Sequence, residues 1–473
     1  MKINHLYFAT SFIFLLYSVG YSQPDTVWTR SYGTPLIDRC VSVSKATNSG
    51  YFLGGLSSNG DNYFWLIIRV DSLGNELWRY TDPQQGSYCA HTIAMPDGGC
   101  IATGAKIIYR RGYDARIQRL NNDGDVIWDH CYGGQFQDRG VKIIRLVNGE
   151  FLMVGGFEPG IIDFDTWILR FNEDGDSLDS YIIDDRAGFA GAADFFINGN
   201  DITVSGTYGA AGACLAKLNL EGNIQWIRNY PLWERVSIRS SAPTLDGGCI
   251  LVGFNTPDNE SNADAIMIRT AENGDTLWTR IIVEDGTNLF ASVIPVQGDG
   301  HLIAGVSSIV DPDGDAILYR LSENGELLWQ QNYGLEVADR FYSSIQLADG
   351  SFVNGGSINI NNGDFWLIKT ESDPNEISAP HNVYLPDKFS ILFAYPNPFN
   401  SVTKFDYQVF IPGQFDLKIF NHLGQEVYRM NRGYHTTGVH SLIWNAQGFE
   451  SGCYNAVIHN GNSVSTSKLI LIK

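Results

Sequence analysis

The sequence lacks the cysteine patterns that cross-link small domains through disulfides or bind a structural metal. It contains seven cysteines, an odd number, and no Cys-x-x-Cys pair. We therefore expect neither a disulfide scaffold nor a structural zinc site. Cys100 and Cys249 each follow two glycines at the start of a predicted strand. This position favours small apolar side chains buried in a β core.

Positive charge is also scarce. The chain has 32 Lys and Arg against 52 Asp and Glu, which gives a formal net charge of -20. A protein this acidic repels phosphate backbones and anionic lipids, so nucleic acid and acidic membranes are excluded as expected partners. Neutral glycans, cations and basic proteins remain open as ligands.

Long apolar runs are missing beyond the N-terminus, so no later segment is expected to span a bilayer. The N-terminus itself has Lys2, an apolar run from Leu6 to Val19, and small residues at Gly20 and Ser22. This layout is typical of a secretory signal peptide, residues 1–22, that is cleaved after Ser22. A membrane anchor is the alternative, although the run falls short of the ~18 residues that a spanning helix needs.

Charged residues make up only 18% of the chain, whereas Gly (50), Trp (11), Tyr (23) and Phe (26) are plentiful. This composition favours short strands joined by tight turns over amphipathic helices. One core stops growing at roughly 250 to 300 residues. At 473 residues, the chain is therefore expected to be an all-β protein of at least two domains.

A segment of the form Gly-x-x-x-Trp recurs along the chain. The Trp position and its equivalents fall at intervals of 48 to 52 residues, at Trp28, Trp78, Trp128, Leu178, Trp226, Trp278 and Trp329. A period near fifty with four short strands per unit is typical of a β-propeller. Seven Trp-type strands match seven sets of inner strands if Thr26 to Tyr32 completes the last unit. The sequence thus predicts a seven-bladed propeller over residues 25–370, closed by its N-terminal strand; an open solenoid, six blades or eight blades are the alternatives.

Two kinds of repeated residue have structural explanations. The Trp of each unit is expected to pack between blades. An Asp begins the third strand of five units, where it typically accepts hydrogen bonds from turn amides; these are Asp114, Asp165, Asp264, Asp315 and Asp364. The units, such as Ile117 to Leu120 followed by Gly124 to Trp128, resemble the pyrroloquinoline-quinone-type and related Trp-repeat (WD-like) propellers. That resemblance implies a fold and no cofactor.

A stretch rich in proline, serine and acidic residues, 371–388, is predicted to be a linker. Beyond it, residues 389–473 alternate as about seven short strands, enough for a small immunoglobulin-like β-sandwich. Five sequence blocks follow one another there: Tyr395-Pro396-Asn397-Pro398, Leu417 to Val427 with Gly424-Gln425, Gly438 to Trp444, Gly452-Cys453-Tyr454, and Lys468 to Lys473.

These blocks resemble the type A C-terminal sorting domain of type IX secretion substrates. The resemblance implies that the type IX secretion machinery is a partner and that the propeller reaches the cell surface or the medium. Cys453 and Asn455 depart from the apolar residues that are usual in the fourth block. An accessory immunoglobulin-like module is the alternative interpretation.

Catalytic motifs are sparse. Gly-x-Ser-x-Gly and the Asp box Ser-x-Asp-x-Gly-x-Thr-Trp are both missing, which disfavours triad hydrolases and sialidase-like glycosidases. Asp311, Asp313 and Asp315 alternate in a loop and form a weak candidate for a calcium site. Ala316 and Ser322 stand where an EF-hand needs Gly and Glu.

The most informative polar pattern is Tyr-Gly, four intervening residues and then Asp-Arg. It ends at Asp38-Arg39, Asp138-Arg139 and Asp339-Arg340. In a propeller these residues lead from the outer strand of one blade into the innermost strand of the next, so we expect them at the mouth of the central channel. One interpretation is an ion pair between blades that fixes the loop. The other is a rim of donors and acceptors that binds a sugar or a peptide.

The sequence therefore favours an exported, non-enzymatic binding or interaction module with an unknown glycan or protein ligand. The alternative is an extracellular carbohydrate-active hydrolase or lyase with catalytic carboxylates on the channel face.

Overall fold

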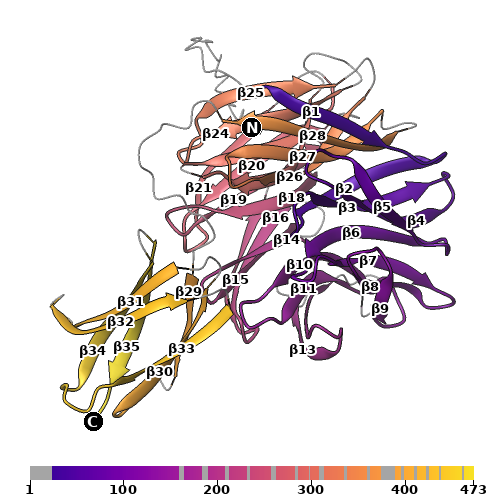
Figure 1. Cartoon of the computed structure of the whole chain (residues 1–473). Coiled ribbons are helices and arrows are strands. Elements are labelled where there is room, and N and C mark those ends of the chain that lie inside the picture. Colours follow the sequence, from indigo (N-terminus) through magenta and orange to yellow (C-terminus); the bar gives the residue numbers. More distant parts are fainter. Residues whose placement is uncertain are drawn as a thin grey trace, which may run out of the picture.

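The computed structural model describes most of the chain, and every regular element in that part is a β-strand (Figure 1). The described residues are 24–158, 165–183, 190–207, 212–231, 235–256, 263–282, 286–297, 299–307, 314–334, 338–359, 363–373, 389–395, 399–409, 413–421, 425–435, 438–460 and 463–473. The predicted signal peptide, residues 1–22, lies outside them. In the described part, no helix is long and apolar enough to cross a membrane.

Strands β1 to β28 form seven antiparallel sheets of four strands, which are the blades of a propeller. Blade 1 consists of β2 (Ile37–Lys45), β3 (Tyr51–Ser58), β4 (Tyr63–Val70) and β5 (Glu76–Thr81). Blades 2 to 4 are β6 (Ser87–Ala94), β7 (Cys100–Ile108), β8 (Gly112–Leu120), β9 (Val126–Tyr132); β10 (Arg139–Arg145), β11 (Phe151–Phe157), β12 (Asp165–Phe171), β13 (Ser177–Ile183); and β14 (Ala190–Asn198), β15 (Asp201–Thr207), β16 (Gly212–Asn219), β17 (Ile224–Pro231). Blades 5 to 7 are β18 (Arg235–Pro243), β19 (Cys249–Thr256), β20 (Asp264–Thr270), β21 (Thr276–Ile282); β22 (Leu289–Pro295), β23 (His301–Ser307), β24 (Asp315–Leu321), β25 (Leu327–Tyr333); and β26 (Arg340–Gln346), β27 (Ser351–Ile358), β28 (Asp364–Ser372) with β1 (Thr26–Tyr32).

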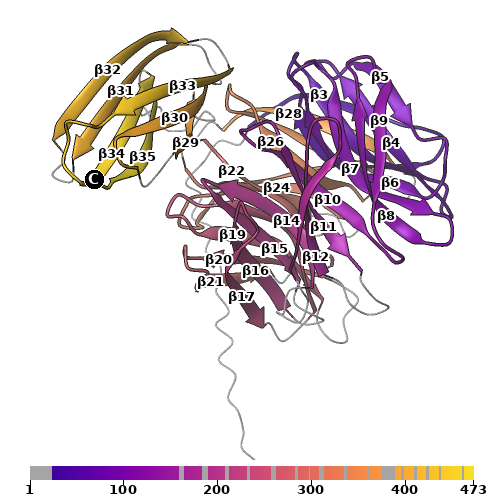
Figure 2. The same cartoon turned by 90° about the horizontal axis from the view of Figure 1, so that it is seen from below.

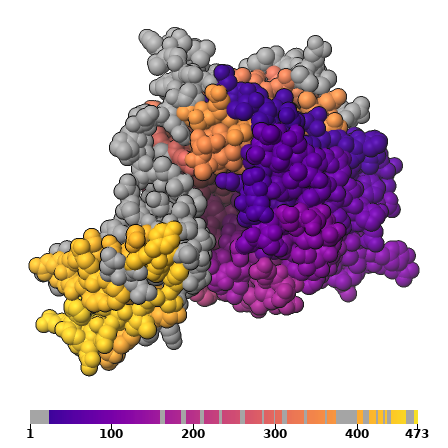
Figure 3. Space-filling model, viewed as in Figure 1, coloured from indigo at the N-terminus to yellow at the C-terminus, as the bar shows by residue number. Residues whose placement is uncertain are grey.

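The N-terminal strand closes the ring. β1 pairs antiparallel with β28, from Thr26 opposite Thr370 to Tyr32 opposite Phe365. Figure 1 shows the indigo β1 beside the orange β28, and the space-filling view in Figure 3 shows indigo atoms directly against orange ones. The predicted seven blades and their closure by the N-terminal strand are confirmed, and β28 gains a partner that covers its free edge.

The Gly-x-x-x-Trp repeat is a contact between neighbouring blades. Gly124 has a φ of 87°, and a methyl group on it would lie 2.8 Å from the Trp78 ring of the preceding blade. The same ring donates from Nε1 to the carbonyl of Asn122 at 2.8 Å. Only glycine fits a turn that is both left-handed and covered by an indole. Blade 3 differs, because Leu178 is 48% exposed and the ring over Gly222 belongs to Tyr181.

A belt of hydrogen bonds in the channel wall also joins the blades. The innermost strand of every blade has a free edge and a β-bulge. Backbone N–H groups on a free edge need acceptors from outside the sheet. Thr92 N in blade 2 donates to Ser42 Oγ in blade 1 at 3.1 Å. Val43 N in blade 1 donates to Ser343 Oγ in blade 7 at 3.1 Å, so the closure uses the same contact.

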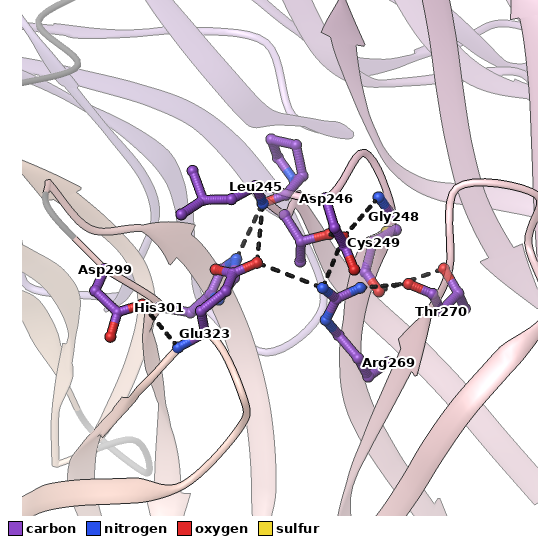
Figure 4. Close-up of polar contacts among 11 residues, drawn as sticks. Leu245, Asp246, Gly248, Cys249, Arg269, Thr270, Asp299, His301 and Glu323 are labelled. Carbon is purple, nitrogen blue, oxygen red and sulfur yellow. Dashed lines mark hydrogen bonds and ion pairs between the residues drawn. The ribbon is translucent and has the colours of Figure 1, made fainter.

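Buried arginines link neighbouring blades at one end of the propeller. This end carries the turns between the first and second strands of each blade, and we call it the turn face. Arg269 of blade 5 is 4% exposed, donates to Asp246 at 2.8 Å, and lies 3.4 Å from Glu323 of blade 6 (Figure 4). Glu323 also accepts a hydrogen bond from Leu245 N at 2.8 Å. This network of ion pairs and hydrogen bonds links blade 5 to blade 6. The equivalent buried arginines in other blades are Arg69, Arg119 and Arg320.

In the last blade a carboxylate accepts the Trp hydrogen bond that a turn carbonyl accepts elsewhere, as Asn122 does for Trp78. Its outer strand is β1, so no Gly-x-x-x-Trp turn follows β28. Trp329 Nε1 therefore donates to Asp373 Oδ1 at 3.1 Å, and Arg320 donates to Asp373 Oδ2 at 2.8 Å. Arg320 and Asp373 are each 3% exposed. The ion pair holds blade 6 against the end of blade 7.

The C-terminal segment forms the predicted small β-sandwich (Figure 2). A three-stranded sheet orders as β29-β30-β33 and a four-stranded sheet as β32-β31-β34-β35. The strands are β29 (Phe389–Tyr395), β30 (Val402–Val409), β31 (Gly413–Asn421), β32 (Glu426–His435), β33 (Gly438–Asn445), β34 (Gly452–Asn460) and β35 (Ser463–Leu471). Both sheets contribute to one core centred on Trp444, which is fully buried.

The candidate sorting residues fall at strand ends. Tyr395 ends β29, Gly452 opens β34, and Gln425 N donates to Asn421 Oδ1 at 3.0 Å in the turn before β32. Tyr454 is 7% exposed and its hydroxyl donates to the carbonyl of Glu450 at 2.7 Å. Pro396, Asn397, Pro398 and Gly424 lie outside the described residues.

Candidate binding site at the channel mouth

The three aspartates of the Tyr-Gly-to-Asp-Arg pattern are fully buried at the end of the blades where the chain enters each innermost strand, which we call the entry face. Asp38 accepts from Thr34 N at 2.5 Å, Asp138 from Gly134 N at 2.5 Å and Glu158 N at 2.9 Å, and Asp339 from Asn359 N at 2.6 Å. Each carboxylate thus holds the loop that leads into its blade.

The arginine of each pair points away from its aspartate, because neighbouring residues of a strand face opposite sides. Arg39 and Arg139 are exposed and Arg340 is partly exposed. Asp38 takes its hydrogen bonds from Thr34 and Ser57. Burial raises the pKa of the Asp38 carboxyl, and those hydrogen bonds oppose the rise. The aspartates therefore have a structural contact, and the arginines are available to solvent.

Arg39 and Arg139 line one cavity of about 460 Å³ on the entry face. The other lining residues are Leu56, Tyr63, Tyr88, Tyr113, Gln137 and Asp138, so blades 1, 2 and 3 all contribute. This volume lies in the range of small-molecule sites. The lining combines apolar ring faces with several hydrogen-bonding groups.

Two tyrosines of blade 2 form the wall between the arginines. The Tyr88 and Tyr113 ring centroids lie 6.4 Å apart. Tyr88 is also hydrogen-bonded to Arg139, which lowers its pKa, but burial is the larger effect and raises the pKa above its ordinary value. Tyr88 is therefore a neutral phenol at physiological pH, which positions the Arg139 guanidinium.

A fourth arginine comes from the bulge of blade 5. Bulges leave one residue out of the ladder and re-aim its side chain. Blade 5 has Arg239 at that position, whereas the other blades have Val41, Ala90, Val141, Ala193, Ala291 and Tyr342. The Arg239 side chain is exposed, yet surrounding protein lowers its pKa, and Arg340 and Arg139 lower it further. Its guanidinium lies 5.1 Å from the Phe254 ring centroid of the same blade.

Sequence reasoning missed Arg239 and the tyrosines. The Asp-Arg pattern does not extend to blade 5, where Ile238 precedes Arg239. A signal was nevertheless present, because Arg39, Arg139, Arg239 and Arg340 follow one another at intervals of two repeats. Blades 1, 3, 5 and 7 therefore each contribute one arginine, and blades 7 and 1 are neighbours where the ring closes.

The aspartates that begin the third strands are buried or half-buried at the entry face. Asp114 is 2% exposed and lies 3.4 Å from Arg111, and burial raises the pKa of its carboxyl while Asp138 adds to the rise. Of the calcium candidates, Asp315 opens β24, whereas Asp311 and Asp313 lie outside the described residues. In the described part of the chain, no three His, Cys, Asp or Glu side chains converge as metal ligands would.

Comparison with known proteins identifies the C-terminal part. Residues 393–473 match the model of the secretion system C-terminal sorting domain. The segment is therefore a sorting domain of the type IX secretion system, and the expected secretion machinery is a partner. The propeller that precedes it is cargo exported to the cell surface or the exterior.

Comparison of the propeller gives only remote likenesses. A fungal alcohol oxidase of the AA5 family in complex with copper shares 9% identity over 95% of this chain and 100% of its own, with a TM-score of 0.47. Sqt1 of Chaetomium thermophilum shares 8% over 81% of this chain and 96% of its own, with a TM-score of 0.43. A subtype N10 neuraminidase-like protein of A/little yellow-shouldered bat/Guatemala/060/2010 shares 12% over 73% and 99%, with a TM-score of 0.38. No curated protein matches the chain. The fold assignment rests on the strand order described above.

Proposed function

We propose that the exported propeller is a non-enzymatic binding module whose ligand occupies the cavity at the channel mouth. The cavity of about 460 Å³ lined by Arg39, Tyr63, Tyr88, Tyr113 and Arg139 carries this proposal. Its guanidinium and phenol groups can donate hydrogen bonds, and its rings offer flat apolar surfaces. The surrounding strands are held by the buried aspartates, so the groups are fixed before a ligand arrives, which reduces the entropy cost of binding.

The lining supports binding more than hydrolysis. A glycosidase needs two carboxyl groups that flank the scissile bond. Among the described lining residues the carboxylate is Asp138, whose oxygens accept hydrogen bonds from two backbone N–H groups. A lyase would need a base, and the pKa of Tyr88 is raised rather than lowered. These features favour a protein that holds its ligand unchanged.

An array of immobilised glycans and peptides tests the proposal. We expect wild-type protein to be retained on a defined subset, and the double variant Tyr63→Ala/Arg139→Gln to lose that retention. Both residues line the cavity and have solvent-exposed surface, so the variant should fold.

The control pair is Tyr109→Ala/Arg228→Gln. Tyr109 is 83% exposed in the turn after β7, and Arg228 lies on the outer strand of blade 4. Neither residue lines the cavity. Retention that survives the cavity variant, or that falls equally in the control, would show that the ligand binds elsewhere. Release of shortened glycans from the array would favour a hydrolase or lyase instead.

A further inference from the structure

We propose that the junction between blades 2 and 3 binds a calcium ion through the carboxylates of Asp114 and Asp138. The site lies on the entry face, beside the cavity that Asp138 lines. The inference does not depend on which ligand that cavity takes. Its main observation is a pair of buried carboxylates from different blades, one of which has an oxygen without a hydrogen-bond partner in the described structure.

The two carboxylates lie against the same glycine. Asp114 lies near the start of β8 in blade 2, and Asp138 directly precedes β10 of blade 3. A methyl group on Gly133 would lie 2.4 Å from Asp138 Oδ2 and 2.9 Å from Asp114 Oδ1. Since both oxygens lie within 3 Å of one point, a single calcium ion can bind both of them, with Ca–O distances of about 2.3 to 2.6 Å.

The Asp114 carboxylate is only partly compensated by the protein. Asp114 is 2% exposed, and its Oδ1 accepts no hydrogen bond in the described structure. Its Oδ2 lies 3.4 Å from Arg111 Nη2. Arg111 therefore contacts one oxygen of the carboxylate, whereas the other oxygen is directed at Asp138, a second anion. A buried oxygen in this position indicates a missing ion or water.

The Asp138 carboxylate is oriented by neutral groups. Asp138 is fully buried, and it accepts hydrogen bonds from Gly134 N at 2.5 Å and from Glu158 N at 2.9 Å. Backbone amides fix the direction of a carboxylate, but they carry no net charge to cancel its own. Two carboxylates that share a buried site repel each other unless a cation or a proton lies between them.

The junction between blades 5 and 6 provides a comparison within the same ring. Asn288 N donates to the Ala263 carbonyl at 2.7 Å, just as Asp138 N donates to the Tyr113 carbonyl at 2.6 Å, so Asn288 and Asp138 occupy equivalent positions. The third strand of blade 5 keeps its buried carboxylate, Asp264, which is 7% exposed. This junction thus has one carboxylate where the junction of blades 2 and 3 has two, and it has no carboxylate pair for a cation to bridge.

The surroundings of the pair suit a hard cation. Calcium takes six to eight oxygen ligands from carboxylates, carbonyls and water, and it tolerates irregular geometry. Gln137 and Asp138 line the same cavity, so an amide oxygen and cavity water are available as further ligands. The site needs only two acidic side chains, which agrees with the lack of any converging group of three in the described part of the chain.

A calcium ion here would join two blades directly beneath the cavity wall. Tyr113 and Gln137 each precede one of the two ligands in sequence, and Arg139 follows Asp138; all three line the cavity. The ion therefore stabilises the junction and fixes the position of the groups that the cavity presents.

Thermal melting of the secreted protein tests the inference. The protein is first treated with a chelator and then returned to calcium, magnesium or potassium chloride at equal ionic strength. An ion that binds only the folded state raises the melting temperature. We expect calcium in tenfold excess over its Kd to raise it by about 2 °C or more, and magnesium to raise it less. Calorimetric titration should give one calcium ion per chain, with a Kd of about 10⁻³ M or tighter.

Asp114→Asn is the diagnostic variant, because it removes the charge of the carboxylate whose Oδ1 lacks a partner and keeps the size of the side chain. It should abolish the calcium-dependent shift in melting temperature. Without calcium it should be at least as stable as the wild type, since the repulsion by Asp138 is removed. Asp264→Asn is the matched control, because it changes the buried carboxylate at the equivalent position of blade 5. It should retain the full calcium-dependent shift.

Several outcomes would overturn the inference. Asp114→Asn may not keep the calcium-dependent shift, and Asp264→Asn may not lose it as Asp114→Asn does. A magnesium shift as large as the calcium shift would mean that calcium is the wrong ion. If calcium has no effect, and the wild type but not Asp114→Asn loses stability between about pH 4 and pH 7, the two carboxylates share a proton instead.

Discussion

The turn face and the entry face of the propeller each hold four arginines, and the two sets have opposite surroundings. On the turn face Arg69, Arg119, Arg269 and Arg320 are 3% or 4% exposed and donate to backbone carbonyls or carboxylates. On the entry face Arg39, Arg139, Arg239 and Arg340 have solvent access, and Arg340 and Arg139 contribute to the lowered pKa of Arg239.

The role of a repeated arginine therefore depends on the hydrogen-bond acceptors around it and not on its position in the repeat. Each turn-face arginine donates hydrogen bonds to carbonyl or carboxylate oxygens of the protein, so its charge is compensated within the fold. The entry-face arginines keep solvent access instead. The first set therefore stabilises the blades, whereas the second faces solvent.

The largest effect that separates the two sets is expected from removing Arg320. Arg320→Leu leaves the buried Asp373 carboxylate without its partner, and breaking such a pair costs about 3 to 5 kcal/mol of unfolding free energy. Arg340→Leu on the entry face should cost less than about 1 kcal/mol, as is usual for a partly exposed side chain. Chemical denaturation of both variants measures the difference.

The double variant Arg320→Leu/Asp373→Leu provides the control. It removes both charges, so it should recover most of the loss caused by Arg320→Leu. A stability loss of similar size in Arg320→Leu and Arg340→Leu would contradict the division between the two faces.

The fold could be predicted from sequence because its repeats are local. Gly124 and Trp78 lie one repeat apart, and their contact is imposed by a turn that only glycine fits. Counting such contacts gave seven blades and the closure by β1. Leu178 was placed wrongly, since the spacing of the repeat does not show that Tyr181 supplies the ring over Gly222. A spacing identifies a position, but packing decides which side chain fills it.

The candidate site could be predicted only in part. The Asp-Arg pattern located three arginines at the channel mouth but not the separate roles of its two residues, which follow from strand geometry. The sequence did not predict Arg239 as a site residue, because its position depends on a β-bulge. Nothing in Ile238-Arg239-Ser240 indicates that a bulge occurs there. The net charge of -20 also pointed away from anions, because a sum over the chain does not show that Arg39 and Arg139 line one cavity.

A smaller effect is expected from acid, and it should fall on the turn face. His301 is 2% exposed, and its Nε2 lies 3.0 Å from the carbonyl of Pro243 in the neighbouring blade. Burial is the main cause that lowers its pKa to about 4; the charges of Arg269 and Arg320 act in the same direction, and the hydrogen bond with Pro243 opposes them. The folded protein keeps this imidazole neutral, whereas the unfolded chain binds a proton below about pH 6.5. Stability is therefore fully present above pH 6.5 and is lost as the pH falls towards 4, by about 2 kcal/mol at pH 4.5.

Denaturation of wild type and His301→Gln between pH 7 and pH 4.5 measures this contribution. Glutamine can still donate to the Pro243 carbonyl but does not titrate, so the variant should lose less stability over that range. A variant that loses as much as the wild type would show that His301 does not contribute to the acid sensitivity of the turn face.

The smallest effect, and the one of opposite sign, is expected on the entry face. Burial lowers the pKa of Arg239, and the repulsion of Arg340 and Arg139 lowers it further. Arg239→Gln relieves that repulsion and should stabilise the free protein, by an amount on the order of 0.5 kcal/mol because the group has solvent access. The comparable change on the turn face, Arg269→Gln, should destabilise, since it frees Asp246 and Glu323 from their shared partner. Melting curves at low salt test both signs together. If removing Arg239 stabilises the protein, the residue is not retained for the stability of the fold. A loss of stability in Arg239→Gln would instead mean that the channel arginines stabilise the blades, as the buried arginines do.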